Sequence, residues 1–267
     1  MTDPSRAPSL FARLRRDVAA ERPVALATVI DGAQTGAKLL VTPDAVAGTL
    51  GDDDLDRVVT RDVRGALAVG STGVRHYGAA GEARREDVSV FIECFAPPPR
   101  LVLFGAVDFT GALVRLGVGV GYRVVVCDAR ATFATAARFP EAHEVVVDWP
   151  HRYLDGIGAD LGPRDAVCVL THDPKFDVPA IIAALATDVG YLGAMGSRRT
   201  TKERNQRLRV EGVTDEQLTR LMAPIGLDLG GRTPEETAIS ILAEIIAHRT
   251  GRHVPSLRDA DGDIHAD

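Results

Sequence analysis

The pattern of hydrophobic and polar positions changes near residue 97, and this change predicts two domains. Before it, short strand-like runs are mixed with two amphipathic helical patterns, which indicates a small α+β domain at 1–96. From the consecutive prolines onward, unbroken apolar runs alternate with helical patterns over 97–251. This is the pattern of a doubly wound parallel sheet, an α/β fold whose strands are buried on both faces. A polar, acidic tail at 252–267 follows.

The expected elements follow from the spacing of apolar residues and from the turn residues between them. In the first domain we predict helices at 8–21 and 52–69 and strands at 24–30, 38–42, 46–50, 73–77 and 88–95. In the second we predict strands at 101–104, 122–127, 144–147, 166–170 and 191–193 and helices at 113–120, 132–139, 178–186 and 198–211. A last helix begins at Thr233, which forms a capping box with Glu236. The predicted apolar face of this last helix is Ile239, Leu242, Ile245 and Ile246.

The first strand–turn–helix–strand unit of the second domain lies within residues 100–128 and resembles the start of a nucleotide-binding fold. When the turn is aligned with G-x-G-x-x-G, Gly105 is present, but Val107 and Thr110 replace the second and third glycines. Asp108 adds negative charge where phosphates would lie against a helix N-terminus. The unit therefore predicts the fold strongly and a bound dinucleotide weakly.

Asp128 ends the second strand of this unit, at the position of the acid that binds a ribose hydroxyl in dinucleotide enzymes. Two interpretations remain open, because the carboxylate can bind a ribose or can pair with Arg130. Together with Gly105 and Asp108, Asp128 is a candidate ligand contact of this first crevice.

The loop at 193–199 is the most informative one at the expected carboxyl edge of the sheet, where ligands of open α/β folds bind. Gly193 and Gly196 allow a tight turn, and Ser197 can cap the next helix or donate its hydroxyl. Arg198 and Arg199 add fixed positive charge beside the free N–H groups of that helix. These features predict a phosphate site. The alternative is a plain strand-to-helix turn with surface arginines.

The loop at 171–177 carries the second candidate set, with His172, Asp173, Lys175 and Asp177 after a buried strand. These groups can transfer protons or orient a ligand. Alternatively, the two carboxylates cap the following helix. A metal site here would lack a second histidine, and we predict neither a metal centre nor a catalytic set.

A glycine-rich loop at 224–234 precedes the last helix. One interpretation is a flexible lid near the ligand pocket, because long loops of this kind often cover sites. The other interpretation is a structural connection between the last strand and the last helix.

Composition limits the classes of function. The chain has 267 residues, with 45% hydrophobic and 25% charged residues, as in ordinary globular proteins. Its net charge of −6 argues against sequence-independent nucleic-acid binding and against adhesion to anionic membranes. The three cysteines are far apart and lie in apolar runs, which indicates buried thiols. We see neither a membrane-spanning run nor a signal peptide, and we expect a cytoplasmic protein.

Several stretches, in this order, resemble the xanthine dehydrogenase accessory proteins of the XdhC/CoxI type. In the second domain they are Phe104-Gly-Ala, Cys127-Asp-Ala-Arg130, Arg138-Phe-Pro140, Thr171-His-Asp173, Gly193-Ala-Met-Gly-Ser-Arg-Arg199, Pro224-Ile-Gly-Leu-Asp-Leu-Gly230 and the last helix from Thr233 to Glu244. The first domain matches more loosely, through Ala25-Leu-Ala-Thr-Val29 and Gly36-Ala-Lys-Leu-Leu-Val41.

The resemblance implies a C-terminal Rossmann domain and a role in maturing molybdenum hydroxylases. Such proteins bind molybdenum cofactor as cargo, protect it while its sulfido ligand is installed, and deliver it to a hydroxylase such as xanthine dehydrogenase. The implied partners are therefore the hydroxylase and a cofactor sulfurase, and the implied assembly is a homo-oligomer. Two rival functions are an NAD(P)-dependent oxidoreductase and a maturation scaffold that holds no ligand.

Two segments depart from the family pattern. The chain has Gly105-Ala-Val-Asp108 where the family usually has Gly-Ala-Gly-His, and Thr49-Leu-Gly-Asp-Asp-Asp54 where it usually has Ser-Gly-Gly-Cys. The loop at 193–199 could hold the cofactor phosphate without a glycine-rich first loop. We therefore expect Ser197, Arg198 and Arg199 to bind this phosphate. We expect His172, Asp173 and Lys175 to contact the pterin or its edge.

Overall fold

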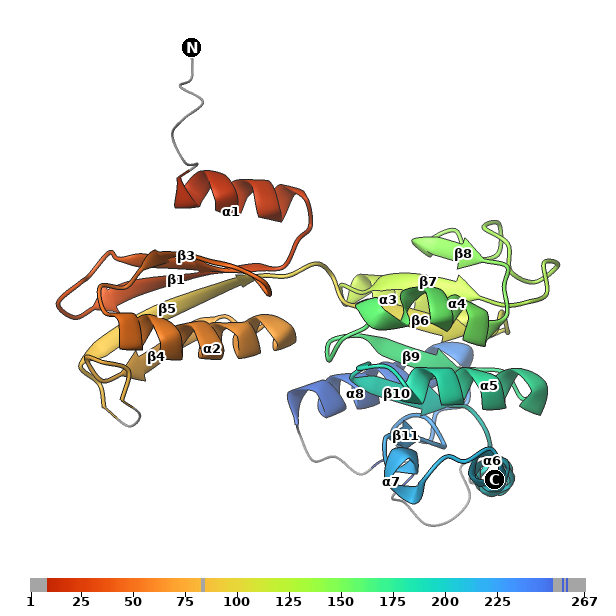
Figure 1. The fold of residues 1–267 in the computed structure, drawn as a ribbon. Coiled ribbons are helices and arrows are strands. Elements are labelled where there is room, and N and C mark those ends of the chain that lie inside the picture. The colour runs from red at the N-terminus through yellow and green to blue at the C-terminus, as the bar shows by residue number, and fades with distance from the viewer. Residues whose placement is uncertain (1–8, 83–84, 252–255, 257, 259–267) are drawn as a thin grey trace. The chain divides into compact units, whose positions relative to one another are not determined.

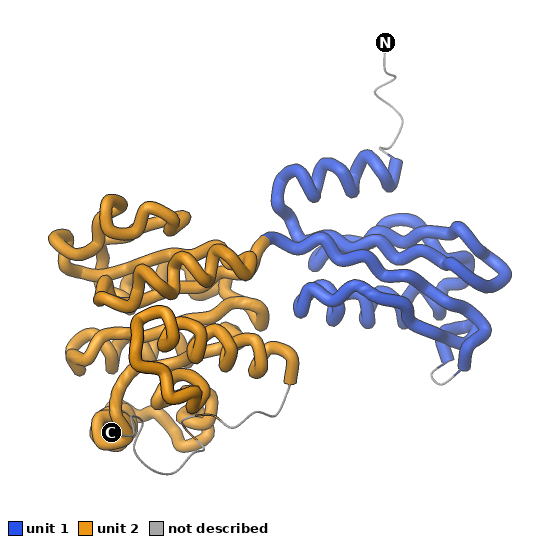
Figure 2. The backbone as a smooth tube through the Cα atoms, turned by 180° about the vertical axis from the view of Figure 1, so that it is seen from behind, with its two compact units in different colours: residues 1–97 blue, residues 98–267 orange. Residues whose placement is uncertain are grey.

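The computed structural model describes residues 9–82, 85–251, 256 and 258 (Figure 1). The chain divides into two compact units, residues 1–97 and residues 98–267 (Figure 2). Of the polar tail predicted at 252–267, only Ser256 and Arg258 lie within the described residues.

The first unit is an antiparallel sheet with the strand order β3-β2-β1-β5-β4 and helices on both of its faces (Figure 1). Its strands are β1 (Val24–Asp31), β2 (Lys38–Val41), β3 (Val46–Thr49), β4 (Gly73–Tyr77) and β5 (Val88–Phe95). Its helices are α1 (Leu10–Ala19) and α2 (Asp53–Val69). Leu55, Val59 and Val63 of α2 pack on alternate residues of β1, because side chains two apart on a strand share a face. The predicted hairpin at 38–50 is present.

The second unit is a parallel sheet with the strand order β11-β10-β9-β6-β7-β8. Numbered along the chain within this unit, the order is 6-5-4-1-2-3, that of the Rossmann fold. Its strands are β6 (Arg100–Phe104), β7 (Arg123–Cys127), β8 (Glu144–Val146), β9 (Ala166–Val169), β10 (Tyr191–Ala194) and β11 (Leu221–Met222). Its helices are α3 (Thr110–Gly119), α4 (Pro150–Ile157), the short 3-10 turn η1 (Gly158–Asp160), α5 (Pro174–Leu185), α6 (Arg198–Val210), α7 (Asp215–Leu218) and α8 (Pro234–Thr250).

The core of the second unit lies on both faces of the sheet, as the unbroken apolar strands predict. On one face, Leu154 of α4, Ile181 of α5 and Leu208 of α6 pack on the sheet. On the other face, Leu113 of α3 and Ile241 of α8 do so. The doubly wound architecture is therefore confirmed, and the strand order places a topological switch point between β6 and β9.

The prediction of a helix at 132–139 is wrong, because these residues form a series of turns. The segment is short, its threonines lower helix propensity, and Pro140 disfavours helical backbone at the residue before it. The crossover to β9 is instead covered by α4, which the pattern did not predict.

The predicted apolar face of the last helix is half wrong. Leu242 and Ile245 are buried, but Ile239 is 50% exposed and Ile246 is 37% exposed. The buried face is Ala238, Ile241, Leu242 and Ile245, which follows the i, i+3, i+4, i+7 spacing of a helix stripe. The prediction chose Ile239 and Ile246 because they are large and apolar. The first position of the buried stripe is instead occupied by a small residue, Ala238.

The first part of the loop at 224–234 is a structural connection. The Ile225 N–H donates to the Ala194 carbonyl at 3.1 Å, and the Gly226 N–H donates to the Glu244 carboxylate at 2.8 Å. Glu244 is buried and also accepts from the Tyr191 hydroxyl at 2.6 Å. These bonds fix the loop against β10 and α8, so they oppose a lid that opens at residues 225–226.

Candidate functional site

The loops after β6, β7, β9 and β10 meet at the carboxyl edge of the parallel sheet, where the sequence placed the candidate residues. They form two separate regions. One is the first crevice, around Gly105 and Asp128, and the other is a cavity between the loop at 171–177 and the N-terminal half of α6.

In the first crevice, backbone N–H groups of the loop after β6 donate hydrogen bonds to side chains of the protein itself. The Ala106 N–H donates to Asp128 Oδ2 at 2.8 Å, and the Val107 N–H donates to the Thr110 hydroxyl at 3.2 Å. Gly105 has φ +117°, and a Cβ placed there would lie 2.8 Å from Thr171 Cγ2, so this turn fits tightly against the β9 loop. In dinucleotide sites such N–H groups point at the pyrophosphate. Here they are satisfied within the protein.

Asp128 pairs with Arg130, which is one of the two interpretations left open by the sequence. Its carboxylate accepts from Arg130 Nε at 2.9 Å, Arg130 Nη2 at 2.7 Å, the Arg130 N–H at 2.9 Å and the Ala106 N–H at 2.8 Å. A carboxylate has roughly four acceptor positions, so these donors leave none for a ribose hydroxyl. Burial alone would raise the pKa of Asp128, but the bonds from Arg130 and Ala106 outweigh it and lower the pKa below its ordinary value.

The second region is a cavity of about 360 Å³. Four of the residues that line it are candidates from the sequence, namely His172, Asp177, Gly196 and Ser197, and the loops at 171–177 and 193–199 therefore do converge. The other lining residues are Pro174, Thr200, Glu203, Arg204 and Arg207.

Arg204 carries a buried positive charge at this cavity. Its side chain is 3% exposed, and its Nη2 donates to Asp177 Oδ2 at 3.3 Å and to the Met195 carbonyl. Asp177 is equally buried and also accepts a short hydrogen bond from the Thr171 hydroxyl. Arg204 Nη1 has no hydrogen-bond partner among the described residues. A buried donor without a partner costs free energy, and Arg204 is one of the residues that line the cavity.

Burial raises the pKa of Asp177, against the opposing effects of the Thr171 hydrogen bond and the Arg204 charge. Burial likewise lowers the pKa of Arg204, against the attraction of Asp177. An arginine in a protein nevertheless stays protonated, so Arg204 keeps its positive charge beside the Asp177 carboxylate.

The N-terminus of α6 forms one side of the cavity. The Ser197 side chain caps the helix by accepting from the Thr200 N–H at 3.2 Å, and the two hydroxyls lie 3.0 Å apart. The first turn of α6 contains no acidic residue, so its free N–H groups are not opposed by a carboxylate there. Hydroxyls, helix N–H groups and Arg204 together suit a phosphate group.

The remaining candidates lie elsewhere. Gly193 is buried inside β10, where a Cβ would lie 2.4 Å from Ile225 Cδ1, so packing explains this glycine. Asp173 caps α5 by accepting from the Lys175 N–H at 3.0 Å, while Asp177 is an ion-pair partner and not a cap. Asp108 is exposed on the β6 loop.

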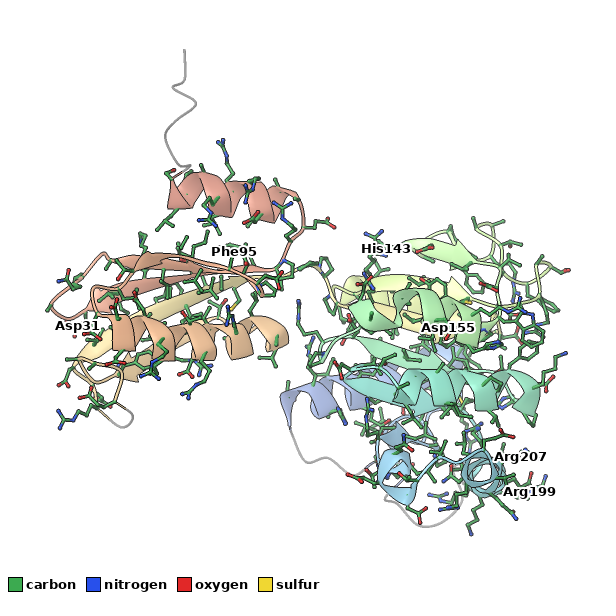
Figure 3. The ribbon with its side chains drawn as sticks, in the orientation of Figure 1. Asp31, Phe95, His143, Asp155, Arg199 and Arg207 are labelled. Carbon is green, nitrogen blue, oxygen red and sulfur yellow. The ribbon has the colours of Figure 1, made fainter. Side chains whose placement is uncertain are left out.

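The cationic side chains singled out by the sequence lie outside the cavity. Lys175 lies over the rings of Trp149 and Phe176, with Nζ 5.4 and 4.9 Å from their centroids. Arg199 is 88% exposed, and its Nε is 3.9 Å from Glu203 Oε1 (Figure 3). Arg198 and Arg199 are not among the described residues that line the cavity.

The sequence-based interpretation missed Arg204 and Arg207, although a signal was present. Leu208, near the end of α6, is a large apolar residue in an otherwise polar helix, and it must face the core. Counting back four residues from Leu208 gives Arg204 on the same buried face. A buried arginine on a helix that flanks a ligand edge indicates an anion site.

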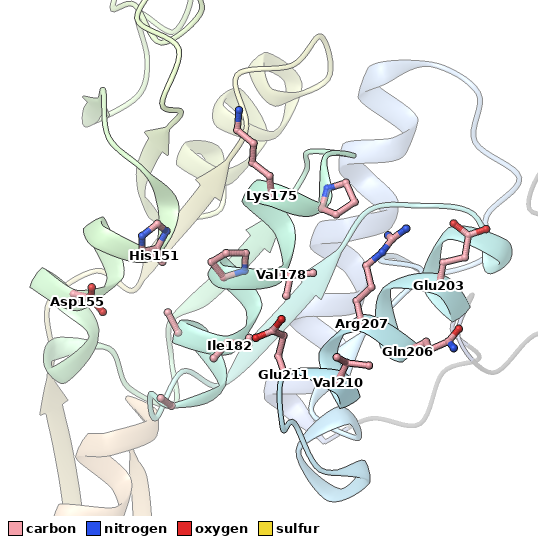
Figure 4. A pocket seen from close by; sticks show the side chains of 14 residues that line it. His151, Asp155, Lys175, Val178, Ile182, Glu203, Gln206, Arg207, Val210 and Glu211 are labelled. Atoms are coloured by element: carbon pink, nitrogen blue, oxygen red, sulfur yellow. The ribbon is translucent and has the colours of Figure 1, made fainter.

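A larger groove of about 1000 Å³ continues from the cavity between α4, α5 and α6 (Figure 4). The two share Pro174, Glu203 and Arg207. Val178 and Ile182 of α5 and Val210 of α6 give the groove apolar walls, with charged side chains between them. In the described part of the chain, no helix is long and apolar enough to cross a membrane, and no set of three or more His, Cys, Asp or Glu side chains is arranged to hold a metal ion.

Comparison with known proteins identifies the family. The model of the XdhC Rossmann domain matches residues 101–245, and the model of the XdhC and CoxI family matches residues 17–78. The chain belongs to the XdhC/CoxI family. The resemblance seen in the sequence is thereby confirmed, and the parallel sheet of the second unit is the Rossmann domain of that family.

Two curated relatives cover much of the chain. A Bacillus subtilis protein, named as a probable subunit of xanthine dehydrogenase, is 33% identical over 164 residues, which are 61% of this chain and 47% of that protein. The Escherichia coli molybdenum cofactor insertion chaperone PaoD is 29% identical over 155 residues, 58% of this chain and 42% of that protein. The chain thus spans less than half the length of these relatives.

A solved structure has the same fold. The crystal structure of a xanthine dehydrogenase from Bacillus halodurans matches with a TM-score of 0.52 at 21% identity, and covers 90% of this chain and 96% of that one. At 21% identity, this likeness shows that the two chains share a fold.

Proposed function

We propose that this protein binds molybdenum cofactor as cargo and passes it to a molybdenum hydroxylase of the xanthine dehydrogenase kind. The observation that carries the proposal is the buried Arg204, which lines the cavity and has an Nη1 atom without a partner among the described residues. A carrier needs a fixed group that recognises the cargo, and a buried guanidinium recognises phosphate through paired donors.

The chemistry of the cavity fits the organic part of the cofactor, which ends in a phosphate. We place the phosphate against Arg204, with the hydroxyls of Ser197 and Thr200 and the first N–H groups of α6 around it. Arg207 lies one turn further along α6 and adds a second positive charge at the cavity. His172, at the exposed side of the cavity, is placed to meet the pterin edge.

The name of one relative supports a carrier. One is called a cofactor insertion chaperone and the other a probable subunit of xanthine dehydrogenase. The rival function, an NAD(P)-dependent oxidoreductase, gains nothing from the first crevice, because its glycine-loop N–H groups and the Asp128 carboxylate are bonded within the protein. We further infer that the hydroxylase, and a sulfurase that acts on the bound cofactor, are the protein's partners.

The test compares two arginines of the same helix. Arg207 lines the cavity, whereas Arg209 is held away by Asp215 at 2.8 Å. We expect Arg207→Ala to weaken cofactor retention about tenfold, because a charged hydrogen bond contributes about 1.5 kcal/mol or more. Arg209→Ala should retain the cofactor as the unchanged protein does. The readout is pterin fluorescence after oxidation and release from the purified protein.

Equal cofactor retention by folded Arg207→Ala and Arg209→Ala proteins would contradict the proposal that the phosphate binds in this cavity. A second variant, Ser197→Ala with Thr200→Ala, removes both hydroxyls while leaving the buried ion pair in place. If this variant also retained the cofactor at the original level, the proposed site would be wrong.

A further inference from the structure

The helix α6 is much more basic than the rest of the protein. Its 13 residues include six arginines or lysines and one glutamate, a formal charge of +5 in a chain of net charge −6. Only Arg204 among its basic residues is buried, and Asp177 neutralises it. Arg199, Lys202, Arg207 and Arg209 are exposed, so most of the positive charge of α6 lies at the protein surface.

The surface charge is concentrated toward the start of α6. Near its end, Arg209 pairs with Asp215 at 2.8 Å, which reduces the charge there. In the first turns, Arg199 (Figure 3) is 88% exposed and only loosely paired with Glu203 at 3.9 Å, and Lys202 is exposed. Helical periodicity places Arg198 and Lys202, four residues apart, on one side of the helix. We call Arg198, Arg199 and Lys202 the basic face of α6.

The basic face is not explained by the stability of the helix. Cations in the first turn of a helix oppose its macrodipole and therefore destabilise the helix. Helices α2, α7 and α8 follow the favourable rule, with acidic residues in their first turns. The cargo cavity does not explain the basic face either, because Arg199 and Lys202 are not among the described residues that line it.

The position of the basic face relates it to the cavity. Ser197, Thr200, Arg204 and Arg207 of the same helix line the cavity, while Arg199 and Lys202 lie on its solvent side. A molecule that bound the basic face would therefore sit beside the cargo. The net charge of −6 repels nucleic acid at long range but does not oppose a protein that presents a local acidic patch.

We propose that the basic face of α6 docks an acidic patch on the protein that receives the cargo. This inference rests on the proposed carrier function. Complementary charges speed the diffusional encounter of two proteins and fix their orientation, so the cavity would face the recipient during transfer. The interaction is then fast and sensitive to salt, as suits a transient handover.

The test reverses charge at matched positions. Arg199→Glu with Lys202→Glu changes the basic face, and Arg61→Glu with Arg64→Glu makes the same change of charge on exposed residues of α2 in the other unit. Association of each protein with an apo molybdenum hydroxylase is followed by stopped-flow at low and high salt. We expect the association rate of the α6 variant to be lower by about tenfold or more at low salt, and the difference to shrink at high salt. The α2 variant should associate at the same rate as the unchanged protein.

Cofactor retention is measured on the same samples and separates this inference from the proposed function. Unchanged retention in the α6 variant is expected, because neither substituted side chain lines the cavity. Equal association rates for the α6 and α2 variants would overturn the docking surface. So would binding of duplex DNA that the α6 substitutions abolish. A wild-type protein that associates with the hydroxylase but holds no pterin would instead overturn the carrier function alone.

Discussion

Arg204 and Asp177 form a buried pair at the edge of the candidate site, and the free energy of this pair depends on both partners. Each side chain is 3% exposed, and Thr171 holds the carboxylate from a second direction. Removing one partner of a buried pair leaves an uncompensated charge, which costs more than the pair itself contributes. Asp177 therefore acts as the positioning residue for Arg204, and its effect should appear in both stability and binding.

We expect Asp177→Asn to lower the free energy of unfolding by about 3 kcal/mol, because the Arg204 charge loses its buried counter-charge. The matched control is Asp215→Asn, which breaks the exposed pair with Arg209 and should cost less than about 1 kcal/mol. Urea unfolding followed by tryptophan fluorescence checks both, since the single tryptophan, Trp149, lies in the second unit. Similar losses of unfolding free energy in the two variants would contradict the claim that the buried pair matters more for stability than the exposed pair.

At the scale of elements, much of the fold was predictable because local patterns and packing agree. In β6 and β9, continuous apolar runs marked buried parallel strands, and the capping box at Thr233 and Glu236 fixed the start of α8. Predictions failed where a pattern was short or ambiguous. Residues 132–139 had too few turns for the helical period to decide, and α4 carries few apolar positions.

The candidate site was only half predictable, for a related reason. Its loops follow strands, so the convergence of His172 and Ser197 could be inferred from topology. The direction of a helix side chain depends on which face the helix buries, and that is set by tertiary packing. Arg198 and Arg199 stood next to the glycines in the sequence, whereas Arg204 and Arg207, later in the same helix, are the arginines that line the cavity.

Gly193 gives a test at the level of a strand. Because a Cβ there would lie 2.4 Å from Ile225 Cδ1 and 2.8 Å from the Tyr191 hydroxyl, we expect Gly193→Ala to destabilise the second unit by about 1–3 kcal/mol. Adding Ile225→Val removes the nearest clashing atom and should restore part of this loss. Thermal unfolding measures the stability, and pterin retention is measured in the same proteins.

A role for Gly193 in cargo binding predicts the opposite pattern. Gly193→Ala would then lose the cofactor without losing stability, and Ile225→Val would rescue neither property. Retention that follows the stability of the second unit would assign this glycine to packing between β10 and the loop after Pro224.

At the scale of the whole molecule, the carboxyl edge of the Rossmann sheet has two different regions. The first crevice, where a dinucleotide would lie, is closed by bonds among Ala106, Asp128 and Arg130. The second is a cavity lined by the buried Arg204, which lies on the same helix as the basic face of α6. The phosphate site proposed above therefore lies in the second region and not in the first crevice.

The most direct measurement is the pterin and molybdenum content of the protein purified without oxygen from a host that makes the cofactor. The carrier function predicts stoichiometric pterin with molybdenum in the unchanged protein, and about tenfold weaker retention of both in Arg207→Ala but not in Arg209→Ala. A correctly folded protein that contains neither pterin nor molybdenum, although the host's own molybdenum enzymes are active, would contradict it.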